Sequence, residues 1–378
     1  MTTSTAGGID CDVHIAVPAM KALLPYLEDH WREIIVLRGM DGLDLTSYPP
    51  GAPISCREDW RAPGRRPGTD LERLRRHALD GFGSRHAIAH VLYGAQAVHS
   101  EDLAAALCRA LNDWVAAEWL SPEPRLRASI VVPWQSPELA AAEIERCAPD
   151  QRFVQVQLLV MGDTPLGKRS NWPIYRAAAA HGLPVAVHAG SAYRHAPSAA
   201  TGWGSYLVED YAANATAFQG QVLSLLHEGV LSTFPELRFV LAESGVTWLP
   251  TLLWRATKTW RALRSEVPWV ERSPEELVRD QVRFTLQPFD APPGGGAELE
   301  RFLEHLGSDD LLLFSTDYPH WHFDGDGVWP EGLPDSWARK ALVDNPLATY
   351  PRLREDVMAG PAPGAGRSTT EASEGVTS

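Results

Sequence analysis

A single (β/α)8 barrel of the α/β class is the architecture that the sequence predicts. Eight short β-rich runs follow one another along the chain, at 9–14, 87–92, 128–133, 153–159, 184–189, 237–243, 282–287 and 311–317. Between them lie stretches with an apolar residue at every third or fourth position, as at 101–119, 137–147, 173–181 and 214–231. Strands and helices in alternation predict a parallel sheet, and eight parallel strands are the number that closes a barrel.

Each of the eight predicted strands is a short run rich in apolar residues. The first, IDCDVH, is followed by no GxG fingerprint, which weighs against the alternative of an open doubly wound sheet. The second to fourth are AIAHVL, ASIVVP and FVQVQLL, with the helical patterns EDLAAALCRALNDWVAAEW and PELAAAEIERC between them. The last four are PVAVHA, LRFVLAE, VRFTLQ and LLLFSTD.

Two segments depart from this alternation. The stretch 31–85 is rich in Pro, Gly and Arg, and because so long a connection is usually functional or mobile, we expect a lid inserted after the first strand. Residues 359–378 contain almost no apolar side chains, so they cannot offset the entropy of ordering and are expected to form a disordered tail. The remainder, 1–358, is predicted to be one barrel domain.

The composition of the chain argues against several functional classes. The 378 residues carry a net charge of −14, which opposes binding to nucleic acids and anionic membranes. No secretory signal and no apolar run of membrane-spanning length is recognised, so a cytoplasmic protein is expected. The four scattered cysteines form no CxxC pair, which predicts reduced thiols rather than disulfides or a cysteine zinc site.

Polar residues collect where the predicted strands end, which is where the active site of a parallel barrel lies. Asp12 and His14 alternate on the first strand and therefore face the same side. The fifth strand ends in His188, the sixth in Glu243, and the eighth in Asp317, with His320 three residues later.

Each of these residues has a simpler explanation when taken alone. A strand-end Asp is commonly a helix N-cap, and a lone His is commonly a hydrogen-bonded core residue. Together, two histidines and three carboxylates converging on one pocket would be costly to bury without a cation. Imidazole and carboxylate suit zinc, manganese or iron, so a divalent metal is predicted.

The pattern resembles the amidohydrolase superfamily, specifically the amidohydrolase-related branch that includes the aminocarboxymuconate-semialdehyde and resorcylate-type decarboxylases. The resemblance is carried by IDCDVH, WPIYRAAAAHGLPVAVHAG, FPELRFVLAESGVTWLPTLLWR and LLLFSTDYPHW. It implies metal ligands at Asp12, His14, His188 and Asp317. Two positions depart from the pattern: Asp12 stands where many relatives have His, and Glu243 stands where a His is common.

The number of metal ions stays open at this point. Strand four offers Gln155 and Gln157 but no lysine or glutamate to bridge a metal pair, so one ion is the simpler expectation. Asp12, Glu243, Asp317 and His320 nevertheless supply enough ligand atoms for a second ion.

The main functional hypothesis is a metal-dependent hydrolase of an amide, ester or thioester, in which a bound metal activates water, Asp317 accepts its proton and Glu243 binds metal or orients the water. The 14 tryptophans favour a small, aromatic or polycyclic acyl substrate. The alternative is a metal-dependent non-oxidative decarboxylase of a small carboxylic acid, and a barrel that serves only for binding is a third hypothesis.

Several further expectations are less specific. His320 is interpreted as a partner of Asp317, and Arg194 and His195 as candidates for substrate recognition. Trp248 and Trp254 are expected in the core. The partners expected are a small-molecule substrate and further copies of the chain in a homo-oligomer.

Overall fold

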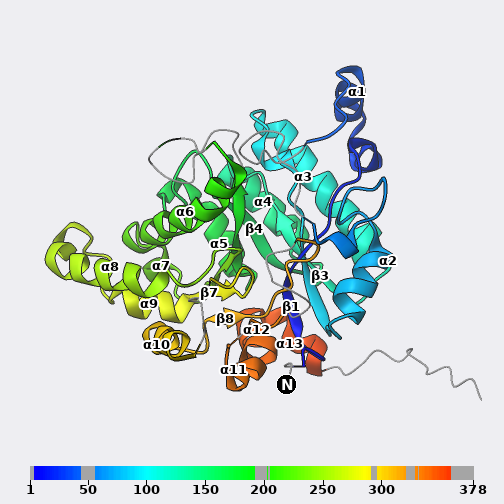
Figure 1. Cartoon of the computed structure of the whole chain (residues 1–378). Coiled ribbons are helices and arrows are strands. Elements are labelled where there is room, and N and C mark those ends of the chain that lie inside the picture. The colour runs from blue at the N-terminus through cyan, green and yellow to red at the C-terminus, as the bar shows by residue number, and fades with distance from the viewer. Residues whose placement is uncertain are drawn as a thin grey trace, which may run out of the picture.

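The computed structural model describes residues 4–43, 56–191, 202, 205–290, 296–320, 328–330 and 332–358. Its centre is one sheet of eight parallel strands in the order β1 to β8, the order of the chain (Figure 1). The strands are β1 Ile9–His14, β2 His86–His90, β3 Leu126–Val131, β4 Phe153–Met161, β5 Val185–Ser191, β6 Phe239–Ala242, β7 Val282–Thr285 and β8 Leu312–Leu313. The predicted (β/α)8 architecture is confirmed.

The barrel closes between β1 and the segment that follows β8. The backbone N–H of Cys11 donates to the carbonyl of Phe314 at 2.8 Å, and that of His14 donates to the carbonyl of Tyr318 at 2.6 Å. The eighth strand is predicted over 311–317, but its regular part is only Leu312–Leu313; farther on, Asp317 has a φ of 54° and turns the chain out of the extended conformation. The sixth strand likewise ends at Ala242, because Glu243 has a φ of 57°.

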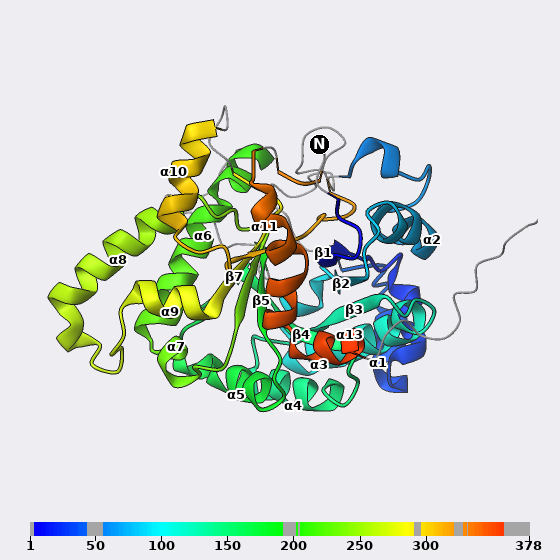
Figure 2. The same ribbon diagram turned by 90° about the horizontal axis from the view of Figure 1, so that it is seen from below.

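Helices surround the strands on the outside of the barrel, as the two views show (Figures 1 and 2). They are α1 Asp29–Leu37, α2 Leu71–Leu74, α3 Glu101–Val115, α4 Pro137–Cys147, α5 Trp172–Ala180, α6 Leu207–His227, α7 Val230–Thr233, α8 Leu249–Leu263, α9 Pro274–Gln281, α10 Gly296–Leu306, α11 Asp335–Arg339, α12 Asn345–Thr349 and α13 Pro351–Met358. The predicted helix at 214–231 is divided into α6 and α7, because Gly229 adopts a left-handed φ of 89° between them.

The segment predicted as a lid contains helices in its described part. Besides α1 and α2 it includes a short 3-10 turn, Glu58–Trp60, whereas residues 44–55 lie outside the described residues. Its second half contacts the loop after β8, since the Arg57 N–H donates to the carbonyl of Pro319 at 3.0 Å and the Trp60 ring lies 5.0 Å from that of Tyr318. These contacts are consistent with a covering role, which stays a prediction. The predicted tail, 359–378, also lies outside the described residues.

The burial of the cysteine and tryptophan side chains agrees with most of the expectations from the sequence. All four cysteines are buried and free, as expected of reduced thiols. Trp248 is buried, as predicted, but Trp254 is 50% exposed, so its assignment to the core was wrong. It lies on α8, on the outside of the barrel. Among the described residues, no helix has the length and hydropathy needed to cross a membrane.

A tight contact between the loop after β4 and α6 gives a stability prediction. A Cβ added at Gly167 would lie 2.2 Å from the backbone oxygen of Ser224, which cannot move without distorting α6. We therefore expect Gly167→Ala to lower the free energy of unfolding by about 3 kcal/mol. The control is Gly220→Ala on the exposed side of α6, where an added Cβ meets nothing within 4 Å, and where alanine should stabilise the helix by about 0.5–1 kcal/mol. Thermal unfolding of both variants measures the difference, and equal transition temperatures would contradict the predicted clash.

Candidate metal centre

The site residues predicted on different strands meet at one end of the barrel. Asp12 and His14 come from β1, and His188 comes from β5. Glu243 and Asp317 are at the turns that follow β6 and β8. Asp12, His188 and Asp317 have no exposed surface, and His14 is 5% exposed. The barrel thus gathers into one buried cluster residues that are up to 305 positions apart in the chain (317 − 12).

His14 lies among the three carboxylates. Its Nε2 atom is 3.0 Å from Glu243 Oε1, 3.0 Å from Asp317 Oδ1 and 3.4 Å from Asp12 Oδ1. All three oxygens therefore surround a single imidazole nitrogen, an arrangement that a cation bound among them would stabilise.

His188 approaches the same carboxylates from the other side of the barrel. Its Nε2 atom is 3.5 Å from Asp12 Oδ2 and 3.4 Å from Glu243 Oε1. Its Nδ1 atom is 2.8 Å from the carbonyl oxygen of Ala189. Because a carbonyl only accepts, Nδ1 carries a hydrogen and donates it, which directs Nε2 toward the cluster and orients it as a metal ligand.

Two strained backbone positions direct the remaining carboxylates. Glu243 and Asp317 are the non-glycine residues with positive φ in the described part of the chain, and such conformations cost about 1–3 kcal/mol each. The Glu243 N–H donates to Thr285 Oγ1 at 3.1 Å, and the Asp317 N–H donates to the carbonyl of Asp12 at 3.0 Å. These hydrogen bonds stabilise both turns in their strained backbone conformation. That conformation directs each carboxylate into the cluster.

The donor set fits a divalent cation. In the part of the chain that the structure describes, both carboxylate oxygens of Asp12, Nε2 of His14 and Nε2 of His188 are buried without a hydrogen bond. Buried polar atoms are rarely left unsatisfied, and here they are nitrogens and oxygens that face one another. A metal ion bound among them would satisfy all of these atoms at once.

The charges within the cluster lower the pKa of an acidic side chain and raise the pKa of a basic one. Burial would raise the pKa of Glu243, but the charge on His188 and the close approach of His14 and His320 outweigh it and hold that pKa well below its usual range. For His188, burial would lower the pKa, but Glu243 and Asp12 raise it to about 9. Glu243 is therefore an ionised carboxylate in this environment, suited to binding a cation.

His320 lies beside Asp317, as predicted. Its Nδ1 atom donates to Asp317 Oδ1 at 2.9 Å and lies 3.5 Å from Glu243 Oε1. Its side chain is 13% exposed, so it forms the outer edge of the cluster. The predicted recognition residues Arg194 and His195 lie outside the described residues.

Sequence reasoning missed His90, which ends β2. Its Nε2 atom is 3.9 Å from Asp12 Oδ1, and its ring contacts Gln155 Nε2 at 3.1 Å and Gln157 Oε1 at 3.3 Å. Burial lowers its pKa to about 3, so the ring is neutral where it lies beside Asp12. The sequence contains a pattern that could have identified it: His90 ends the apolar run AIAH, just as His188 ends PVAVH. The two glutamines on β4 thus position a histidine.

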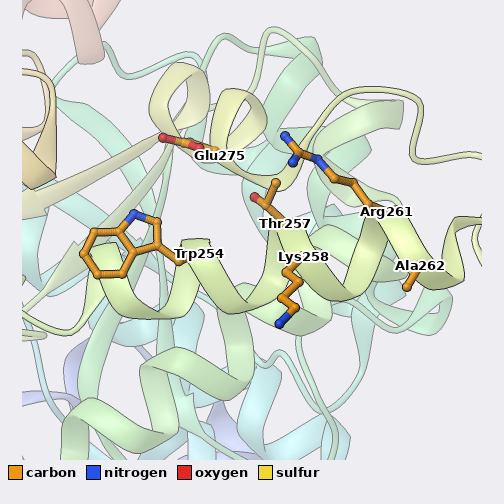
Figure 3. Close-up of a pocket in the computed structure, with 6 residues that line it drawn as sticks. All are labelled: Trp254, Thr257, Lys258, Arg261, Ala262 and Glu275. Atoms are coloured by element: carbon orange, nitrogen blue, oxygen red, sulfur yellow. The ribbon is translucent and has the colours of Figure 1, made fainter.

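A surface pocket elsewhere is not part of this site. It is lined by side chains of α8 and α9, on the outer surface of the barrel (Figure 3). These are Trp254, Thr257, Lys258, Arg261, Ala262 and Glu275. None of them belongs to the buried cluster, and the ring of Trp254 instead packs at 5.1 Å from that of His305 on α10.

Comparison with known proteins agrees with the resemblance seen in the sequence. The chain is 25% identical to a gamma-resorcylate decarboxylase from Polaromonas sp. over 289 residues, which is 72% of this chain and 85% of that protein. It is 26% identical to a gamma-resorcylate decarboxylase from Rhodococcus jostii over 265 residues, 66% of this chain and 77% of that protein. These relatives agree better with the decarboxylase alternative than with hydrolysis.

Solved structures show the same fold. A 2,6-dihydroxybenzoate decarboxylase from Rhizobium superposes with a TM-score of 0.64 at 20% identity, covering 93% of this chain and 99% of that one. A dihydroxybenzoic acid decarboxylase from Polaromonas sp., with bound manganese and the inhibitor 2-nitroresorcinol, gives a TM-score of 0.63 at 19% identity, covering 91% and 96%. The family model described as Amidohydrolase matches residues 9–352. The chain therefore belongs to the Amidohydrolase family.

Proposed function

We propose that this protein is a metal-dependent non-oxidative decarboxylase of a small aromatic carboxylic acid. The observation that carries the proposal is the buried cluster of Asp12, His14, His188 and Asp317, in a chain similar to gamma-resorcylate decarboxylases over most of its length. This agrees with the alternative stated above, and hydrolysis becomes the second candidate.

Asp12, His14 and His188 would hold the cation, because their facing atoms are buried and make no hydrogen bond in the described part of the chain. When bound, a divalent cation supplies positive charge that fixes the substrate carboxylate and an adjacent oxygen. These residues are buried, and a charged substrate would therefore interact more strongly with this site than in bulk water.

Decarboxylation breaks the bond between the ring carbon and the carboxylate, and the electron pair left on that carbon must take a proton. Asp317 is the residue that we assign to deliver it. Its Oδ1 atom faces the cluster at 3.0 Å from His14 Nε2, and it accepts a hydrogen bond at 2.9 Å from His320, which reaches the outer edge. His320 thus connects Asp317 with the outside, and a proton can be replaced there after each turnover.

Hydrolysis of an amide, ester or thioester is supported by one specific observation, the carboxylate of Glu243. It lies 3.4 Å from His188 Nε2 and 3.0 Å from His14 Nε2, and its low pKa keeps it ionised, so that it accepts hydrogen bonds and donates none. An ionised carboxylate in this position could accept a hydrogen bond from a water molecule and orient it for attack.

The test is a comparison of substrates on protein loaded with Mn²⁺. We expect carbon dioxide release from 2,6-dihydroxybenzoate or 5-carboxyvanillate, incorporation of one deuterium into the product in D₂O, and loss of both after chelation. The control is the chelated protein after Mn²⁺ is restored. Cleavage of aryl esters or thioesters without any carbon dioxide release from aromatic acids would contradict decarboxylation and favour the second candidate.

A further inference from the structure

The barrel closes at a seam that has no continuous ladder of paired residues. In the described part of the chain, β1 meets the residues after β8 through the isolated bridge between Val13 and Tyr318, whereas β1 and β2 pair at four positions. The His14 N–H donates to the carbonyl of Tyr318 at 2.6 Å across this boundary. The Asp317 N–H donates to the carbonyl of Asp12 at 3.0 Å. The seam is defined by these five residues, and few backbone contacts of its own keep it closed.

The seam divides the residues of the proposed chemistry. Asp12 and His14, which would hold the cation, lie on β1, and Asp317, which is assigned to deliver the proton, lies on the other side. His14 Nε2 is 3.0 Å from Asp317 Oδ1 across the seam. Opening of the seam would therefore move the proton donor away from the cation, and a misplacement of about 1 Å can cost about 100-fold in rate.

Aromatic side chains of residues 56–82 pack against the seam. The buried ring of Tyr318 lies 5.0 Å from the ring of Trp60 and 6.3 Å from that of His77. Trp60 is 6% exposed, and its ring also lies 6.0 Å from His77 and 6.3 Å from Phe82. Ring pairs at these separations attract one another beyond the burial of their area. Trp60 therefore joins the 56–82 segment to the seam residue Tyr318.

The same segment also bonds to the backbone on both sides of the seam. After β8, the carbonyl of Pro319 accepts a hydrogen bond from the Arg57 N–H at 3.0 Å. After β1, the Ala16 N–H donates to the carbonyl of Gly68 at 2.9 Å. Gly68 lies so close that an added Cβ would be 3.1 Å from the carbonyl oxygen of His14. One segment thus spans the seam and contacts both of its edges.

Trp60 is in turn fixed within its own segment. The guanidinium carbon of Arg57 lies 5.1 Å from the centre of the Trp60 ring, a separation at which a cation is attracted to the ring. From α2, Arg73 donates to the carbonyls of Trp60 at 3.5 Å and Arg61 at 3.2 Å. A ring held from behind in this way can restrain Tyr318.

We propose that Trp60 is a positioning residue, which acts through Tyr318 to keep the seam closed and Asp317 aligned with Asp12 and His14. The consequence for catalysis rests on the proposed function. The closure of the seam does not, because it concerns hydrogen bonds that are present without any substrate.

Amide hydrogen exchange on the full-length, Mn²⁺-loaded chain tests the closure. Peptides that contain His14 and Asp317 are compared with peptides of β4 and β5, so that any change in global stability cancels. In Trp60→Ala we expect the seam amides to exchange at least about tenfold faster relative to β4 and β5, because local opening no longer has to separate the ring pair. Trp60→Phe keeps a ring against Tyr318 and should restore most of the protection.

Trp119→Ala is the matched control. Trp119 is 3% exposed and packs 6.0 Å from Trp114, so its loss removes a ring of similar burial at another place in the core. Its seam amides should exchange at the wild-type rate relative to β4 and β5. Seam exchange in Trp60→Ala that equals the wild type, or that Trp119→Ala reproduces, would overturn the role of Trp60 whatever reaction the protein catalyses.

Kinetics on the best substrate of the decarboxylation panel tests the consequence. Trp60→Ala should lower kcat by about 10- to 100-fold, with Mn²⁺ affinity and KM nearly unchanged, because the assigned cation ligands remain. Trp60→Phe should recover most of kcat. Faster seam exchange with an unchanged kcat would overturn the alignment of Asp317 by Trp60. A wild type that releases no carbon dioxide would contradict the proposed function, whereas faster seam exchange in Trp60→Ala would still support the closure.

Discussion

His188→Ala should abolish metal retention and activity while the barrel stays folded. The side chain has no exposed surface, and its Nε2 atom faces Asp12 and Glu243 at 3.5 and 3.4 Å. Its removal deletes a ligand and leaves these two carboxylates with only one of the two histidines, His14, that face them. Because even residues that only support metal ligands change affinity by about 10–100-fold, we expect the loss here to be at least about 100-fold.

Metal content after dialysis and circular dichroism together check this expectation. His188→Asn is the companion variant, since it keeps a polar group that can still pair with the Ala189 carbonyl. His181→Ala is the matched control on the surface, where the ring bonds to Glu145. Full metal occupancy in folded His188→Ala would show that the ligand assignment is wrong.

Asp317→Asn should lower kcat by about 10²- to 10⁴-fold, the range expected when a positioned proton donor or acceptor is lost. The substitution keeps the shape of the side chain, so the turn at φ 54° and the backbone bond to Asp12 can persist. Asp12, His14 and His188 remain to hold an ion, and KM should therefore change less than kcat.

Steady-state kinetics on the best substrate of the decarboxylation panel, with metal content measured on the same sample, test the assignment. Asp102→Asn is the control, because Asp102 is exposed in the first turn of α3 and does not belong to the cluster. A kcat within tenfold of the wild type, with metal retained, would remove Asp317 from the proton pathway.

The sequence by itself determined the barrel and the members of the candidate site. Apolar runs recurring between helical patterns require a parallel sheet, and the strand ends of such a sheet converge. Asp12, His14, His188, Glu243 and Asp317 could therefore be collected without coordinates, since each ends a predicted strand. His90 could have been found in the same way, but only the structure shows that it lies beside Asp12 and is held by two glutamines.

Only the tertiary structure decided how the side chains of these residues are oriented and spaced in the buried cluster. Strand periodicity places a side chain on a face, but it does not give the left-handed backbone at Glu243 and Asp317 or the distance from His320 to both. Those features arise from contacts between β1, β7 and the turns that follow β6 and β8, such as the bonds of Glu243 to Thr285 and of Asp317 to Asp12. Such contacts join residues far apart in the chain, so no local pattern encodes them, and they set which atoms lie close enough to share a cation.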